Sequence, residues 1–250
     1  MAIRQISTMY DRNTGLRAVI LAGGKGTRLK PYTTTIPKPL VPVGEEPILG
    51  IVLKQLKSAG VRRVTITVNH MAELIMAFFG NGERFGLEID YSLEEKPLST
   101  VAPVKLISDL PDYFFVMNGD LLTDINFPEL YSAHVGSGAK LTIATYKRDS
   151  TIDFGVIDVD KASRRVIGFR EKPTYHFTVS TGVYVYSRQL LDRVPYNEPY
   201  GLDNLVLDML RDNDPINTYP HSGYWLDIGR PDDYEKANQD VDRILGRAEL

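Results

Sequence analysis

A glycine-rich stretch near the start of the chain, LAGGKGTRLKPYTTTIPKPL at residues 21–40, combines a permissive backbone with positive charge. Glycine lets the backbone approach a ligand closely and turn its N–H groups toward it. Arg28 can hold two phosphate oxygens with a planar guanidinium, whereas Lys25 and Lys38 act as point charges. A proline stiffens the backbone on either side of Lys38. Such a stretch suits a triphosphate that loses pyrophosphate.

Two standard phosphate-binding motifs do not fit this stretch. A Walker A loop requires Gly-x-x-x-x-Gly-Lys-Ser/Thr, and Gly23 and Gly24 do not provide that spacing. A Rossmann fingerprint requires a third glycine where Leu29 stands, and an acidic residue after the second strand, where Asn69 stands. The stretch therefore indicates a glycine loop of another type.

The elements that position this loop alternate between strands and helices in the first half of the chain. Continuous apolar runs predict buried strands, and apolar residues at offsets of three and four predict helices. The expected fold is α/β, a doubly wound, mostly parallel (Rossmann-like) mixed sheet that binds ligands at the carboxyl ends of its strands. The predicted strands are 16–22, 63–68, 87–93 and 113–117, and the predicted helices are 48–59, 71–79 and 101–110.

The second half of the chain contains short strands that follow each other closely. Their spacing predicts mixed or antiparallel pairing and a β-rich, substrate-side lobe. We therefore predict an N-terminal tail at residues 1–15 and one domain at residues 16–250. The strands of this half are predicted at 139–146, 155–159, 166–170 and 182–186, and its helices at 202–211 and 232–245.

The bulk composition is that of an ordinary globular protein, with 43% hydrophobic and 24% charged residues among 250. A net charge of −3 and the lack of a long basic block argue against nucleic-acid binding. No apolar run approaches the roughly 20 residues that span a bilayer, so no membrane partner is expected. The absence of cysteine excludes disulfides and thiolate metal sites. No secretory signal is recognised at the N-terminus, so we expect a cytoplasmic protein.

Six segments of the chain occur in the order typical of one known family. They resemble the sugar-1-phosphate nucleotidyltransferases, most of all the short mannose-1-phosphate guanylyltransferase-like branch. The resemblance runs from residue 16 to the last predicted helix and implies a nucleotidyltransferase domain without the β-helix tail of some relatives. The segments are GGKGTRL with PKPL, FFVMNGDLLTDINF, FGVIDVD, GFREKP, STGVYVYS and GYWLDIGRPDDYEKAN.

The resemblance implies that an oxygen of a sugar-1-phosphate attacks the α-phosphorus of an NTP and expels pyrophosphate. The acceptor would be of the mannose-, heptose- or glucosamine-1-phosphate type. The cofactor would be Mg²⁺, which takes one or two protein carboxylates. Asp120 and Asp227 match the metal ligands of the family, whereas Asp124 is assigned to the following loop. Dimers and tetramers are frequent in the family, so a homo-oligomer is compatible with the resemblance.

The remaining site residues follow from the same resemblance. The catalytic cations are Arg28, Lys38 and Lys25, which would act on the triphosphate and the departing pyrophosphate. The nucleotide-binding residues are expected to be Leu21, Ala22, Gly23, Gly24, Gly26, Thr27, Glu94, Pro97, Ser99, Asn118 and Gly119.

A second group of residues is expected to bind the sugar phosphate. Glu171 matches the residue that accepts hydrogen bonds from sugar hydroxyls, and Lys172 matches the residue that contacts the phosphate. Gly155, Thr181 and Gly182 stand at strand starts, where a sugar can approach the backbone.

The segment that should contact the nucleobase departs from the family pattern. The sequence EEKPLSTVAP at residues 94–103 stands where relatives have Pro-Leu-Gly-Thr-Ala-Gly, so Ser99 and Ala102 replace both glycines. A serine side chain takes space and is expected to require an ordinary, negative φ. Glu94 or Glu95 could accept hydrogen bonds from guanine N1–H and N2–H₂ together, which favours GTP.

Two alternatives remain open at this point. One is a non-catalytic nucleotide or sugar-phosphate sensor on the same fold, which the substitutions at Ser99 and Ala102 suggest. The presence of every candidate catalytic and metal-binding residue argues against it. The other is a cytidylyl-, uridylyl- or thymidylyltransferase with another phosphate acceptor.

Overall fold

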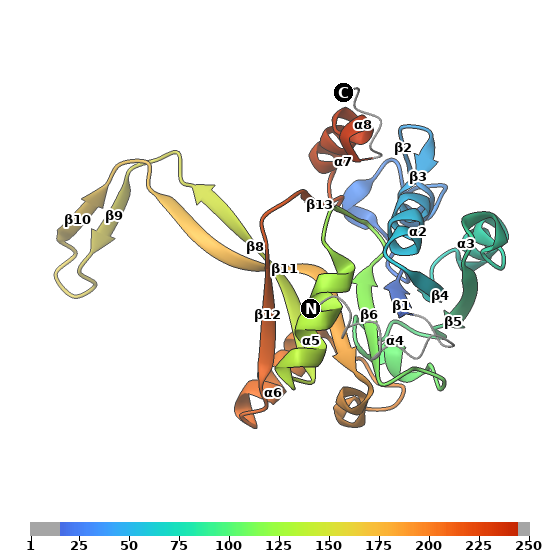
Figure 1. Cartoon of the computed structure of the whole chain (residues 1–250). Helices are drawn as coiled ribbons and strands as arrows, with labels where there is room; N and C mark the ends of the chain where they lie inside the picture. Colours follow the sequence, from blue (N-terminus) through green and yellow to red (C-terminus); the bar gives the residue numbers. More distant parts are fainter. Residues whose placement is uncertain (1–15, 245–250) are drawn as a thin grey trace, which may run out of the picture.

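The computed structural model describes residues 16–244, and the predicted tail at 1–15 and residues 245–250 lie outside the described range. Its centre is a seven-stranded sheet in the order β12-β8-β11-β6-β1-β4-β5 (Figure 1). Strand β11 is antiparallel to both of its neighbours, and the other neighbouring strands are parallel. The doubly wound, mostly parallel mixed sheet is therefore confirmed. The strands are β1 (Leu16–Leu21), β4 (Val61–Val68), β5 (Glu88–Leu93), β6 (Tyr113–Asn118), β8 (Leu141–Thr151), β11 (Thr174–Ser187) and β12 (Ile216–His221).

Strand β1 lies at the switch point of the sheet. The chain runs from β1 through helix α2 (Ile48–Ser58) to β4 on one side, and β6 pairs with β1 on the other side. Leu21 at the end of β1 faces Thr67 of β4 and Asn118 of β6. The loops that follow β1 and β6 therefore start side by side, where a doubly wound sheet binds ligands.

Helices cover both faces of the sheet because its central strands are apolar on both sides. In β1, Ile20 belongs to one core cluster and Val19 to the other, and both side chains are fully buried. Core residues of α2, α3 (Ala72–Phe79) and α5 (Phe127–Ser137) pack with Ile20, and those of α4 (Ala102–Lys105) and α6 (Leu202–Arg211) pack with Val19.

Two predicted helices differ from the structure, and one observed helix was not predicted. The helix predicted at 101–110 is the single turn α4, because Asp109 instead pairs with Arg17 and Arg63. The final helix is broken at Asp240 into α7 (Pro231–Gln239) and α8 (Val241–Ile244). Helix α5 was not predicted, although Asn126 caps it by accepting a hydrogen bond from the Glu129 N–H at 3.1 Å.

The second half contains longer strands than the sequence predicts. Strands β8 and β11 continue past the sheet as a two-stranded ribbon, which carries β9 (Val156–Val159) and β10 (Val166–Arg170) at its far end (Figure 1). We call residues 149–176 the arm. The antiparallel pairing was predicted, but the projection of the arm away from the body was not.

Short elements complete the fold around the end of β6. Strand β7 (Leu121–Thr123) pairs with β13 (Trp225–Asp227), and β2 (Pro42–Val43) pairs with β3 (Glu46–Pro47). Two single turns, η1 (Thr27–Leu29) and η2 (Lys38–Leu40), lie in the glycine-rich stretch. Among residues 16–244, no helix has the length and apolar character required to cross a membrane.

A buried histidine makes the stability of the fold depend on pH. His134 of α5 lies 2.8 Å from Thr142 Oγ1 and 3.1 Å from Ser187 Oγ, and its burial lowers its pKa from 6.5 to about 4. As the pH falls below 6.5, the unfolded chain binds a proton that the folded protein does not accept until about pH 4. We expect the free energy of unfolding to decrease by about 3 kcal/mol between pH 7 and pH 4 from this group.

Urea denaturation at several pH values measures this effect. The variant His134→Gln should lose this part of the pH dependence, whereas His176→Gln on the exposed arm should keep it. An unchanged slope in His134→Gln would show that other groups cause the acid sensitivity.

Candidate active site

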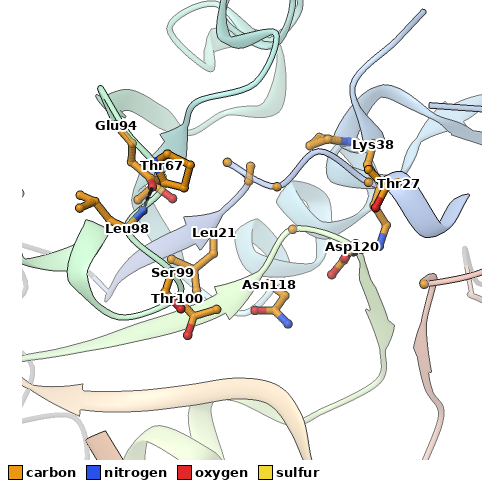
Figure 2. A pocket seen from close by; sticks show the side chains of 18 of the residues that line it. Leu21, Thr27, Lys38, Thr67, Glu94, Leu98, Ser99, Thr100, Asn118 and Asp120 are labelled. Carbon is orange, nitrogen blue, oxygen red and sulfur yellow. Dashed lines mark hydrogen bonds and ion pairs between the residues drawn. The ribbon is translucent and has the colours of Figure 1, made fainter. Parts of the chain in front are cut away.

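A cavity of about 430 Å³ opens at the carboxyl ends of β1, β4 and β6. Figure 2 shows Lys38, Thr27 and Asp120 on one side of it, and Glu94, Leu98 and Ser99 on the other. The structure thus brings together residues that are far apart in the sequence. Every residue predicted to bind nucleotide lines this cavity: Leu21, Ala22, Gly23, Gly24, Gly26, Thr27, Glu94, Pro97, Ser99, Asn118 and Gly119.

Two glycines of the loop lie in close contact with neighbouring segments. A Cβ atom on Gly23 would lie 2.6 Å from Glu94 Oε1. Gly26 has a φ of 60°, and a Cβ there would lie 3.1 Å from both Lys38 Cβ and Thr33 Cγ2. The Thr33 hydroxyl donates a hydrogen bond to the Gly26 carbonyl at 2.8 Å. The loop therefore lies between the segment that carries Glu94 and the segment that carries Lys38.

An ion pair forms the charged end of the cavity, and a second carboxylate lies close to it without lining the cavity. Lys38 is only 9% exposed, and its Nζ pairs with Asp120 Oδ2. The pairing of β13 with β7 sets Asp227 opposite Leu121, next to Asp120 in the chain, and the Ile228 N–H donates to the Asp120 carbonyl at 3.1 Å.

The two carboxylates influence each other electrostatically. Burial raises the pKa of Asp227, and the negative charge of Asp120 raises it further. The cations Lys38 and Arg28 oppose this shift. Two carboxylates that repel each other in a partly buried position would be stabilised by a bound cation.

The same carboxylates fit a divalent metal ion. Asp120 Oδ1 is buried and has no hydrogen-bond partner within residues 16–244, which leaves one oxygen available to a ligand. The described part of the chain holds no group of three or more His, Cys, Asp or Glu arranged as a metal cage. The two carboxylates Asp120 and Asp227 are the residues that could hold a divalent metal ion, whose other ligands would then come from water and phosphate.

The other two predicted catalytic cations, Arg28 and Lys25, differ in their positions relative to the cavity. Arg28 lines the cavity, and a Cβ on Gly229 would lie 3.7 Å from both Arg28 Nη2 and Asp227 Oδ1. The Arg28 guanidinium is therefore placed at the carboxylate end. Lys25 is exposed and does not line the cavity.

The other end of the cavity contains a buried carboxylate. Glu94 is 6% exposed, and its burial raises its pKa, although a hydrogen bond from the Leu98 N–H at 3.3 Å opposes the shift. Glu95 is exposed and does not line the cavity. Of the two adjacent glutamates, only Glu94 can therefore face a ligand in this cavity.

The expectation that Ser99 requires an ordinary φ was wrong. Ser99 has a φ of 69°, the left-handed conformation that a glycine would adopt most easily. Tyr200 holds this segment from both sides, because its N–H donates to the Leu98 carbonyl at 3.0 Å and its carbonyl accepts from the Val101 and Ala102 N–H groups. These bonds offset a backbone strain of about 1 kcal/mol.

Two residues near Glu94 were missed by the sequence analysis. Thr67 lines the cavity, and its buried Oγ1 has no hydrogen-bond partner among the described residues. Asn69 donates from Nδ2 to the Glu94 carbonyl at 2.6 Å and so fixes the start of the segment. In the sequence, only their positions at the end of the predicted strand 63–68 indicated that Thr67 and Asn69 could lie near a ligand.

The predicted sugar-phosphate residues are divided between two places. A Cβ on Gly182, whose φ is 80°, would lie 2.8 Å from Asn118 Nδ2, so Gly182 packs behind the wall of the cavity, although neither it nor its buried neighbour Thr181 lines the cavity. By contrast, residues 155, 171 and 172 lie on the arm and do not line the cavity. Lys172 pairs there with Asp153 at 2.8 Å.

The profile of the family described as Nucleotidyl transferase matches residues 17–243. The chain belongs to this family. A mannose-1-phosphate guanyltransferase from Debaryomyces hansenii is 34% identical over 229 residues, which cover 88% of this chain and 62% of the relative. A UTP–glucose-1-phosphate uridylyltransferase from Synechocystis sp. is 32% identical over 246 residues, 90% of this chain and 63% of the relative. The chain thus spans less than two thirds of the length of these curated relatives.

A solved structure has a similar fold. HddC from Yersinia pseudotuberculosis, complexed with GMP-PN, superimposes with a TM-score of 0.70 at 25% identity. The match covers 90% of this chain and 99% of HddC. The similarity therefore extends over most of this chain.

Proposed function

We propose that this chain transfers a nucleotidyl group from an NTP to a sugar-1-phosphate, with GTP favoured, and releases pyrophosphate. The observation that carries the proposal is the ion pair of Lys38 with Asp120, which lines the cavity beside the glycine loop at the switch point of the sheet, with Asp227 close enough to be influenced by both charges. Nucleotidyl transfer depends on positioning and charge neutralisation rather than on covalent catalysis, and this arrangement supplies both.

Residues at different positions along the cavity have different proposed roles. The N–H groups of the loop at residues 22–27 bind phosphate oxygens, and Arg28 neutralises charge that develops on the departing pyrophosphate. Lys38 holds Asp120 in position and adds positive charge at the α-phosphate. Asp120 and Asp227 hold Mg²⁺, which when bound neutralises and orients phosphate oxygens.

The base preference rests on Glu94. An ionised carboxylate only accepts hydrogen bonds, and guanine presents two adjacent donors at N1 and N2. Uracil presents one donor at the corresponding edge. The guanyltransferase relative and the GMP-PN complex of HddC support GTP, whereas the uridylyltransferase relative supports UTP as the second candidate.

The acceptor is proposed at the level of its class. Mannose-, heptose- and glucosamine-1-phosphate are the first candidates. Gly182 lies against Asn118, which lines the cavity, and the proposed contact of Thr181 and Gly182 with the sugar rests on their positions at a strand start. The roles of Gly155, Glu171 and Lys172 in binding the acceptor are part of the proposal and rest on the family resemblance.

A pyrophosphate-release assay tests the proposed function. The purified chain is incubated with Mg²⁺ and each pair drawn from four NTPs and a panel of sugar-1-phosphates, with phosphocholine as a non-sugar acceptor. We expect release with GTP and at least one sugar-1-phosphate. NTP binding without release from any pair would instead favour the non-catalytic sensor, and release with phosphocholine alone would favour another acceptor class.

The base preference gives a separate prediction. In Glu94→Gln, an amide donor replaces one acceptor oxygen and faces a guanine donor. We expect kcat/KM for GTP to fall roughly 30-fold, while that for UTP changes by less than about threefold. Glu95→Gln, on the exposed neighbour, is the matched control. An equal decrease in kcat/KM for GTP and UTP would show that Glu94 stabilises residues 94–98 and does not distinguish the nucleobase.

A further inference from the structure

We propose that Asn69 is a positioning residue, which holds Glu94 in the place where it distinguishes GTP from UTP. The inference rests on the proposed function, in which Glu94 accepts hydrogen bonds from the nucleobase. Asn69 directly follows β4, and its Nδ2 donates a hydrogen bond to the Glu94 carbonyl at 2.6 Å. One side chain at the end of a central strand thus contacts the backbone of the residue that is proposed to contact the base.

The backbone of Glu94 is held at both of its polar groups. Its N–H donates to the Val68 carbonyl at 2.9 Å, and its carbonyl accepts from Asn69. Val68 ends β4 and pairs with Leu93, the last residue of β5. The bond to Val68 continues this pairing of two strands, whereas the bond from Asn69 depends on one side chain. Removing the Asn69 amide would therefore release one of the two backbone contacts that fix Glu94.

The side chain of Glu94 leaves one oxygen for a ligand. Oε2 accepts a hydrogen bond from the Leu98 N–H at 3.3 Å, whereas Oε1 has no hydrogen-bond partner within residues 16–244. A Cβ on Gly23 would lie 2.6 Å from Glu94 Oε1 and 3.4 Å from Asn69 Cβ. Glu94 and Asn69 therefore both lie against the glycine loop, and the unbonded oxygen is next to the segment proposed to bind the nucleotide.

A second observation indicates a polar ligand group at this end of the cavity. Figure 2 shows Thr67 on the same side of the cavity as Glu94, and its buried Oγ1 has no partner among the described residues. By contrast, the hydroxyl of Thr65, also buried, accepts a hydrogen bond from Arg17 Nη2 at 2.6 Å. Buried hydroxyls normally have such a partner. The edge of a nucleobase would bring polar atoms to this wall.

The position of Glu94 has a larger effect on guanine than on uracil. Guanine presents two adjacent donors, which must meet the carboxylate in one geometry, whereas uracil presents one donor. Hydrogen bonds weaken steeply as their angle departs from linearity. A shift of the Glu94 backbone should therefore weaken the binding of GTP more than the binding of UTP.

Isothermal titration calorimetry of GTP and UTP, with Mg²⁺ and without an acceptor, tests the inference. We expect Asn69→Ala to raise the dissociation constant for GTP roughly 10-fold and that for UTP less than about threefold. Asn69→Asp keeps the shape of the side chain but replaces the amide donor by an acceptor, so it should weaken GTP binding at least as much. The matched control is His70→Ala, because the side chain of His70 makes no hydrogen bond within residues 16–244.

The ratio of the two dissociation constants is measured on one preparation, so a partly unfolded variant does not change it. An unchanged ratio in Asn69→Ala would overturn the inference. In the double variant with Glu94→Gln, we expect Asn69→Ala to weaken GTP binding by less than about threefold more, because both residues act through one contact. Fully additive losses would overturn the inference as well.

The outcome is separable from that of the proposed transfer reaction. A wild-type chain that binds GTP but releases no pyrophosphate would contradict the transfer and leave the role of Asn69 to the binding data. A wild-type chain that binds neither nucleotide would overturn both.

Discussion

Replacing Asp120 by asparagine is expected to reduce kcat by at least about 100-fold, the scale of losing one charge-stabilising group in a transition state. The substitution would leave Lys38 without its carboxylate partner and the metal site without one of its two charges. Excess Mg²⁺ should not restore activity, because the amide is a weak ligand for a hard cation. Initial rates of pyrophosphate release over a range of Mg²⁺ concentrations measure the effect.

The matched control for this prediction is Asp124→Asn. Asp124 stands four residues further along but accepts a hydrogen bond from the Tyr224 N–H at 2.7 Å, which an asparagine oxygen can also accept. We expect its activity to stay within about threefold of the wild type. Near-normal turnover of Asp120→Asn would remove Asp120 from the metal site. Thermal unfolding of both variants separates a catalytic loss from a loss of folded protein.

Replacing Arg28 by alanine is expected to lower kcat by about 100-fold with less than a threefold change in the KM of the sugar phosphate. Arg28 lines the cavity near Asp227, where its charge would stabilise the departing pyrophosphate. Arg28→Lys should recover only part of the loss, because a lysine cannot hold two phosphate oxygens in one plane. Steady-state kinetics with each substrate varied in turn distinguishes the two constants.

Lys25→Ala is the informative comparison for Arg28. Both residues were predicted as catalytic from the sequence and both are exposed, but only Arg28 lines the cavity. We expect a decrease in kcat of less than about tenfold for Lys25→Ala. An unchanged kcat together with a raised sugar-phosphate KM in Arg28→Ala would reassign Arg28 to the acceptor. A larger loss in Lys25→Ala than in Arg28→Ala would show that the loop moves when nucleotide binds.

The parts of the site that follow directly from a strand were predictable. The glycine loop after β1 and Asp120 after β6 are each marked by an apolar run that ends in glycine, and both runs are strands in the structure. Glu94 could not be distinguished from Glu95, since only the fold decides which of two neighbours is buried. The conformation of Ser99 was predicted wrongly, because it depends on bonds to Tyr200, a hundred residues away.

The sequence by itself determined the order of strands and helices in the first half, the family resemblance and the residues of the glycine loop, because periodicity and turn residues act over a few positions. Only the tertiary structure decided that Asp227 lies beside Asp120, through the pairing of β13 with β7. It also decided that Lys38 is paired and that the arm projects from the body of the protein (Figure 1). These features depend on contacts between residues distant in the chain, and no local pattern encodes such contacts.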